Sequence, residues 1–141
     1  MLIKSDEGNK RRKTLTISME SIPISANKLL RSHWAVRGKE IDRWGCLIAA
    51  TLSPHDRHAL RKNAQKPSPA LVTVNSVYLH RRKAFDPDNA VAALKTVLDG
   101  MVRANLLHDD TEKYVKVEIP KQLTQCGPGF ILILTWTEKR G

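Results

Sequence analysis

The stretch that decides the fold is residues 86–105, DPDNAVAALKTVLDGMVRAN. Asp86 suits the N-cap of a helix, and Pro87 suits the first turn, where its missing N–H leaves no hydrogen bond unmade. Apolar side chains recur at helical spacing and form one stripe expected to be buried. The members of this stripe are Val91, Leu94, Leu98 and Met101. The stretch therefore predicts an amphipathic helix from Asp86 to about Asn105.

Alternating or continuous apolar runs on both sides of this helix predict strands. They lie at residues 14–19, 71–80, 115–119 and 130–136. The last run is apolar on both faces and is therefore expected to be a central strand. Residues 27–52 predict a second helix with a possible break at Gly38. The order β-α-β-α-β-β predicts a single-domain α+β fold with a mixed four-stranded sheet and two main helices.

Charge is distributed unevenly along the chain. Lys and Arg number 24 against 14 acidic residues, for a net charge of +10. A basic domain this small usually binds a polyanion, because each phosphate contact releases a counterion. Residues 85–112 reverse the balance, with six acidic and two basic side chains. Carboxylates repel a phosphate backbone unless a cation lies between them, so the pattern favours a DNA-binding surface with a divalent metal at its acidic centre.

The remaining segments bound the domain and its surroundings. Residues 1–12 are charged and predict a disordered basic arm, which leaves residues 13–141 as the folded domain. Residues 53–69 are rich in Pro, Lys, Arg and His and predict a long loop, mobile and facing DNA. No apolar run is long enough to span a membrane, and no signal peptide is expected. Cys46 and Cys126 lack metal-ligand spacing and favour two free thiols in a reducing cytoplasm.

Two carboxylates and a lysine share one face of the predicted helix, away from its core. At 100° per residue, Asp88, Lys95 and Asp99 fall within about 20° of one another around the axis. Asp86 lies at the mouth of the helix. Hard oxygen ligands of this kind bind Mg²⁺ or Mn²⁺ together with substrate phosphate oxygens. A lysine beside the metal can stabilise the added negative charge of a phosphodiester transition state.

Each acidic residue also has an ordinary structural explanation. Asp86 can serve only as an N-cap, and Asp88 can serve only to interact favourably with the positive end of the helix dipole. Asp99 can form a surface ion pair with a basic neighbour on the helix. Residues 109–110 can be a turn, and spacing does not show whether they fold back to Asp86. These explanations work singly, but they account poorly for five aspartates within 25 residues of a strongly basic protein.

The same string of residues resembles the RusA family of phage-encoded Holliday junction resolvases. The matching pattern is Asp86-Pro87-Asp88-Asn89, a helix with Lys95 and Leu98-Asp99-Gly100, then Leu107-His108-Asp109-Asp110. A second, weaker match is the early segment Ser25 to Trp34. The resemblance covers roughly residues 14–137, and the spaced acidic string is its specific part.

The resemblance implies a homodimeric, Mg²⁺-dependent endonuclease with a RusA-like fold that resolves four-way DNA junctions by paired symmetric nicks in recombination and repair. Mn²⁺ is a possible substitute, and no small-molecule cofactor is expected. Carried over residue by residue, the metal-binding catalytic acids are Asp86, Asp88 and Asp110, with Lys95 as catalytic lysine. Asp99, Asp109 and Asn89 are expected to support them. The implied setting is the cytoplasm, bacterial or phage-encoded.

One position departs from the family pattern. The family lysine follows the Asn by three residues, where this chain has Ala92, and Lys95 comes three residues later. One helical turn keeps Lys95 on a similar face but about 4.5 Å further along the axis. The role of Lys95 is therefore open between a modified catalytic geometry and phosphate binding.

DNA contacts are expected mainly to phosphates, because a junction is recognised by its shape. The candidates are Asn27, Lys28, Arg31, Arg37, Lys39, Arg81, Arg82 and Lys83. Among the three tryptophans, which are more often core residues, Trp34 is the exception, since basic side chains surround it. The histidines have no zinc-site spacing with enough partners and favour surface or phosphate-contacting positions.

Two other functions compete with the nuclease. A non-catalytic module of the same fold could hold branched DNA without cutting it, and convergence of Asp86, Asp88 and Asp110 would separate the two. A phosphotransferase of the haloacid dehalogenase type also uses an Asp-x-Asp motif. That chemistry needs an apolar strand running into the first Asp, whereas Arg81-Arg82-Lys83 precedes it closely here.

Overall fold

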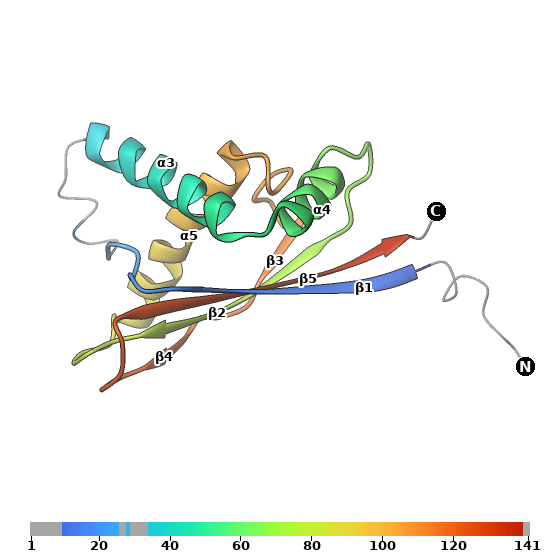
Figure 1. Ribbon diagram of the computed structural model, residues 1–141. Coiled ribbons are helices and arrows are strands. Elements are labelled where there is room, and N and C mark those ends of the chain that lie inside the picture. The colour runs from blue at the N-terminus through green and yellow to red at the C-terminus, as the bar shows by residue number, and fades with distance from the viewer. Residues whose placement is uncertain (1–9, 26–27, 29–33, 140–141) are drawn as a thin grey trace, which may run out of the picture.

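The computed structural model describes residues 10–25, 28 and 34–139. They form an α+β fold of two layers, with a mixed five-stranded sheet and three helices on one of its faces (Figure 1). The predicted α+β class and the mixed sheet are confirmed. The structure adds one strand and one helix to the four strands and two main helices expected from the sequence.

The long strands of the sheet are antiparallel. β1 (Lys10–Met19) pairs with β5 (Gly129–Lys139), and β5 pairs on its other side with β2 (Val72–Leu79). β3 (Val115–Val117) and β4 (Lys121–Leu123) run parallel to β2 and pair with successive halves of it. The predicted central position of β5 is confirmed. Its fully buried side chains are Phe130, Leu132, Leu134 and Trp136.

The helices are α3 (Trp34–Thr51), α4 (Pro54–Ala64) and α5 (Pro87–Arg103). α5 is the helix expected from residues 86–105, with Asp86 at the N-cap and Pro87 in its first turn. Most of its predicted stripe is buried, but Val91 is 46% exposed because it lies about a third of a turn from the centre of the buried face. The buried face of α5 consists of Ala90, Ala93, Leu94, Thr96, Val97, Leu98, Gly100 and Met101.

α3 and α5 cross at two glycines, which lets their backbones touch. A Cβ added to Gly100 would lie 2.7 Å from the backbone nitrogen of Gly45, and one added to Gly45 would meet the Gly100 carbonyl. α3 continues through Gly38, so the break considered there is absent. Its buried Trp44 packs edge-on against Phe130 of β5, which ties α3 to the sheet.

The prediction of a long loop over residues 53–69 is wrong, because most of this segment forms α4. The Ser53 Oγ accepts a hydrogen bond from the Asp56 backbone N–H at 3.1 Å and so caps the helix, and a proline follows in the first turn. Leu60 is fully buried. The Arg61 guanidinium donates to the Ala104 carbonyl at the end of α5, so a basic residue expected to face DNA serves packing instead.

Two boundaries also differ from expectation. β1 begins at Lys10, so the last three residues of the predicted arm belong to a strand, while residues 1–9 lie outside the described residues. The strand expected over residues 115–119 stops at Val117, and Ile119 is 80% exposed. Pro120 explains the interruption, since it has no N–H to donate. Within the described ranges, no helix combines the length and apolar character needed to cross a membrane.

Candidate acidic site on helix α5

The N-terminal end of α5 is fixed to the sheet by a buried tyrosine. The Tyr78 hydroxyl donates a 2.7 Å hydrogen bond to the Ala90 carbonyl in the first turn of the helix. Tyr78 is fully buried, and this burial raises the pKa of its hydroxyl far above the usual value. The hydroxyl therefore stays protonated and acts as a structural donor.

The residue before Asp86 is held by a side-chain amide from β4. The Gln122 Oε1 accepts from the Phe85 backbone N–H at 2.9 Å, while the Gln122 Nε2 donates to the Phe85 carbonyl at 3.0 Å. The His80 Nε2 lies 2.9 Å from the same Oε1 and must donate to it. This network sets the direction in which the chain reaches α5.

The two carboxylates at the start of α5 are exposed. Asp86 occupies the N-cap position but makes no side-chain capping bond, and Asp88 lies in the first turn. Asn89 beside them is partly buried. Three exposed cations, Arg81, Arg82 and Lys83, immediately precede this acidic pair. The start of the helix and the residues before it thus present charges of both signs to solvent.

A second acidic group forms further along α5. The Lys95 Nζ lies 2.8 Å from the Asp110 Oδ2 and 3.9 Å from the Asp99 Oδ1. Asp110 comes from the loop after α5, so this loop does fold back onto the predicted face of the helix. We name Lys95, Asp99 and Asp110 the α5 triad.

The three charges of the triad perturb one another. The hydrogen bond from Lys95 lowers the pKa of Asp110, and the hydrogen bond to Asp110 raises the pKa of Lys95. Partial burial, together with a hydrogen bond to Asp110, raises the pKa of Asp99. Lys95 is therefore held as an ammonium and Asp110 as a carboxylate, and Asp99 is the more easily protonated of the two carboxylates.

The loop that carries Asp110 is anchored from two sides. The Asp110 backbone N–H donates to the Asp109 Oδ1 at 2.7 Å, which gives Asp109 a structural role in the turn. The His108 Nδ1 donates to the Ala64 carbonyl at the end of α4 at 2.9 Å. The His108 ring also packs on Tyr114, with ring centroids 4.5 Å apart. Helix α4 therefore helps to position the triad.

The described residues contain no group of three or more His, Cys, Asp or Glu side chains that could hold a metal ion. The expected trio of Asp86, Asp88 and Asp110 is thus not assembled. The physical reason lies in the helix, because Asp88 and Asp99 are 11 residues apart, or about 16 Å along the axis. Asp110 contacts Asp99 and so lies toward the far end of α5. Two carboxylates, Asp99 and Asp110, do lie in contact. Two carboxylate ligands are enough for a hard cation such as Mg²⁺, which completes its coordination shell with phosphate oxygens.

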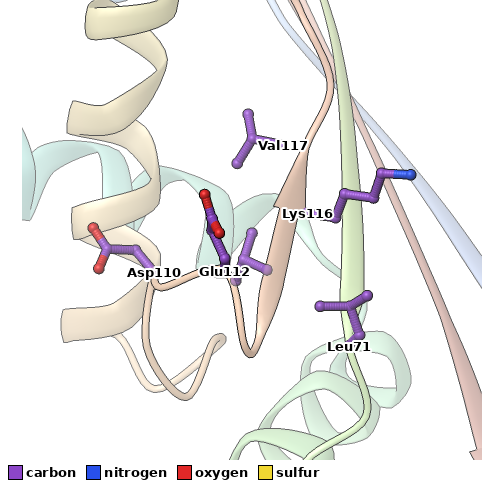
Figure 2. A pocket seen from close by; sticks show the side chains of 6 residues that line it. Leu71, Asp110, Glu112, Lys116 and Val117 are labelled. Carbon is purple, nitrogen blue, oxygen red and sulfur yellow. The ribbon is translucent and has the colours of Figure 1, made fainter.

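A cleft of about 460 Å³ opens beside Asp110 of the triad and is lined by the loop after α5, by β3 and by Leu71. Figure 2 shows Glu112 projecting between α5 and β3, with Asp110 against α5. Val117 points into the same space, whereas Lys116 points away from Asp110. Glu112 was not among the expected site residues. The run Asp109-Asp110-Thr111-Glu112 is the sequence signal that could have included it.

The expected DNA-contacting residues fall on separate surfaces. Arg37 and Lys39 are exposed on α3, and Arg81, Arg82 and Lys83 are exposed before α5. Lys28 is exposed as well, with its backbone N–H donating to the Ser25 Oγ. Asn27 and Arg31 lie outside the described residues.

Comparisons with known proteins add little to this geometry. No family model matches the chain, and no curated protein matches it. A similar solved structure is thiamine-monophosphate kinase from Stenotrophomonas maltophilia K279a, with 10% identity and a TM-score of 0.45. The match covers 94% of this chain but 33% of that one, so this chain spans about a third of the length of the kinase.

Proposed function

We propose that this protein is a metal-dependent endonuclease that binds branched DNA, with the four-way junction as its substrate. The observation that carries the proposal is the α5 triad, in which a loop carboxylate returns to a lysine and a second carboxylate on an exposed helix face. The net charge of +10 supports a polyanionic substrate. The RusA resemblance supplies the substrate class and the homodimer, and both remain predictions.

The triad suits hydrolysis of a phosphodiester. Water attacks phosphorus, the bond from phosphorus to one bridging oxygen breaks, and that oxygen leaves with a proton. The Lys95 ammonium can donate hydrogen bonds to the non-bridging oxygens, whose charge grows in the transition state. The attacking water loses the proton, and the leaving oxygen gains one. A divalent metal bound by Asp99 and Asp110 would lower the pKa of the attacking water and neutralise the phosphate.

Asp86 and Asp88 have a different place in this proposal. They lie at the opposite end of α5 from Asp99, beside the cations of residues 81–83. Their predicted role as ligands of one metal shared with Asp110 is not supported by the arrangement of α5. A carboxylate pair beside exposed cations can restrict how closely the DNA backbone approaches this end of the helix.

One observation favours a second candidate, the non-catalytic branched-DNA-binding module. No three-carboxylate group is assembled among the described residues, and Lys95 already pairs with Asp110 at 2.8 Å. An ion pair of this kind can be structural. A protein with the same basic surfaces would then hold a junction without cutting it.

The test is to incubate the full chain with a labelled four-way junction and with a linear duplex of the same sequence. Each substrate is followed in Mg²⁺, in Mn²⁺ and in EDTA, with binding measured in EDTA so that no cleavage intervenes. We expect tight junction binding, weaker duplex binding and paired nicks only when metal is present. Junction binding without cleavage in either metal would refute the nuclease and leave the binding module. Failure to bind either DNA would refute both.

A further inference from the structure

Trp34 differs from the other two tryptophans of the chain in its exposure. Trp44 and Trp136 are buried, with 0% and 2% exposure, whereas Trp34 is 75% exposed. Tryptophan carries the largest apolar side-chain surface, and leaving most of it in water forfeits the stabilisation that burial would give. Most of the indole surface is therefore accessible from solvent.

The direction of Trp34 on α3 explains why the ring is accessible. At 100° per residue it lies within about 40° of Ile48, on the side of the helix that faces the core. Ile48 is fully buried, but Trp34 lies about 20 Å earlier along the axis, beyond the edge of the core. One turn after Trp34, a Cβ added to Gly38 would have no neighbour within 4 Å among the described residues. The surface of α3 one turn after Trp34 is therefore not covered by any described residue.

The surroundings of Trp34 are cationic. Arg37 and Lys39 are exposed within the next turn and a half of α3. The exposed acid of this region, Asp42, is paired with Arg103 of α5 at 3.0 Å, which reduces its repulsion of a phosphate backbone. An accessible aromatic ring bordered by cations is the arrangement by which proteins stack an unpaired base while holding its backbone.

We infer that Trp34 stacks on a nucleobase that is unstacked from its neighbours, as bases at a DNA branch point or in a single strand can be. This inference rests on the proposed DNA-binding function and adds a base-contacting residue to it. Continuous duplex offers no such base, because its bases are stacked on one another. Trp34 therefore contributes to the preference for branched over linear DNA, while Arg37 and Lys39 contribute attraction to both.

The experiment measures binding in EDTA to a four-way junction with 2-aminopurine at the branch point and to a matched duplex. The variants are Trp34→Ala, Trp34→Leu and Trp34→Phe, with Val36→Ala as a control of similar position and 42% exposure. Stacking on an aromatic ring accounts for about 5- to 150-fold in affinity per base. We expect Trp34→Ala and Trp34→Leu to weaken junction binding by about tenfold or more, Trp34→Phe by less, and Val36→Ala hardly at all.

Two further readouts separate stacking from charge. The wild type should change the 2-aminopurine fluorescence, and Trp34→Leu should not. The slope of log affinity against log salt should be the same in Trp34→Ala as in the wild type, because no phosphate contact is lost. Equal junction affinity of Trp34→Leu and wild type would overturn the inference while leaving the proposed function intact. A wild type that binds neither DNA would overturn both.

Discussion

The crossing of α3 and α5 can be tested by adding one methyl group at Gly100. In the structure, a Cβ at this position would lie 2.7 Å from the Gly45 nitrogen and would also meet the Ile41 carbonyl. Both partners are backbone atoms of α3, so they cannot rotate away as a flexible side chain could. Gly100→Ala must therefore push the two helices apart.

The cost can be set against the benefit of alanine in a helix. Alanine is favoured over glycine by about 1 kcal/mol in a helix interior. Overpacking of a tight contact costs about 1–3 kcal/mol, and a gap of about 0.5–1 Å between packed surfaces also forfeits a quarter to a half of their dispersion energy. The expected net loss for Gly100→Ala is roughly 1–2 kcal/mol. For a domain of this size, that lowers Tm by about 3–7 °C.

Gly38→Ala is the matched control, because Gly38 is in the same crossing pair of helices but has open space around it. In Gly38→Ala only the higher helix propensity of alanine changes the stability, so Tm should rise by about 2–3 °C. Both variants are measured by thermal melting followed by circular dichroism in the same buffer. A Gly100→Ala protein as stable as the wild type would refute the close packing of α3 on α5. Equal effects of the two substitutions would refute the assignment of the contact to Gly100.

Three further outcomes can be measured on the same protein. Tyr78→Phe removes the hydrogen bond to Ala90 and leaves that carbonyl buried, so the free energy of unfolding should fall by about 1–2 kcal/mol in urea titrations. At pH 7 in EDTA, Asp110→Asn should lower Tm and Asp99→Asn should raise it. Asp110 has a lowered pKa, so its carboxylate stabilises the fold above the unfolded value of 3.8, whereas Asp99 has a raised pKa and its ionised form opposes folding. Both differences in Tm from the wild type should vanish as pH falls below the pKa of the substituted group. A difference in Tm that persists at low pH would contradict this electrostatic origin. Replacing Arg81, Arg82 and Lys83 together with Gln should reduce the salt slope of DNA binding by about 3, measured by anisotropy, and an unchanged slope would exclude phosphate contacts there.

The sequence predicts those parts of the fold that depend on local pattern. The amphipathic stripe and the Asp86-Pro87 start gave α5 to within about two residues at each end. The apolar run in residues 130–136 predicted a central strand, and both edges of β5 do pair with neighbouring strands of the sheet. Helix α4 was missed because its charged composition suggested a loop. Its signals were the Ser53 cap, the proline in the first turn and the buried Leu60.

The candidate site was predicted in part. Helical periodicity correctly grouped Lys95 with Asp99, since both lie on one face of α5 and their charges lie 3.9 Å apart. Periodicity says nothing of where the loop after a helix returns, and this decides whether Asp110 meets Asp99 or Asp88. The loop packs through His108 and Tyr114 near the end of α4, which places Asp110 beside Asp99. Tertiary packing, and not helical periodicity, therefore determines that Asp110 lies beside Asp99 and not beside Asp88.

The central claim is that the α5 triad carries out cleavage, and single-turnover cleavage of a four-way junction in Mg²⁺ tests it most directly. The comparison is between the wild type, Asp110→Asn and Glu118→Gln, a control in a surface ion pair with Lys116. The account predicts that Asp110→Asn slows cleavage by about a hundredfold or more while junction affinity in EDTA stays within about threefold. Glu118→Gln should cleave as the wild type does. Cleavage by Asp110→Asn at the wild-type rate would contradict the claim.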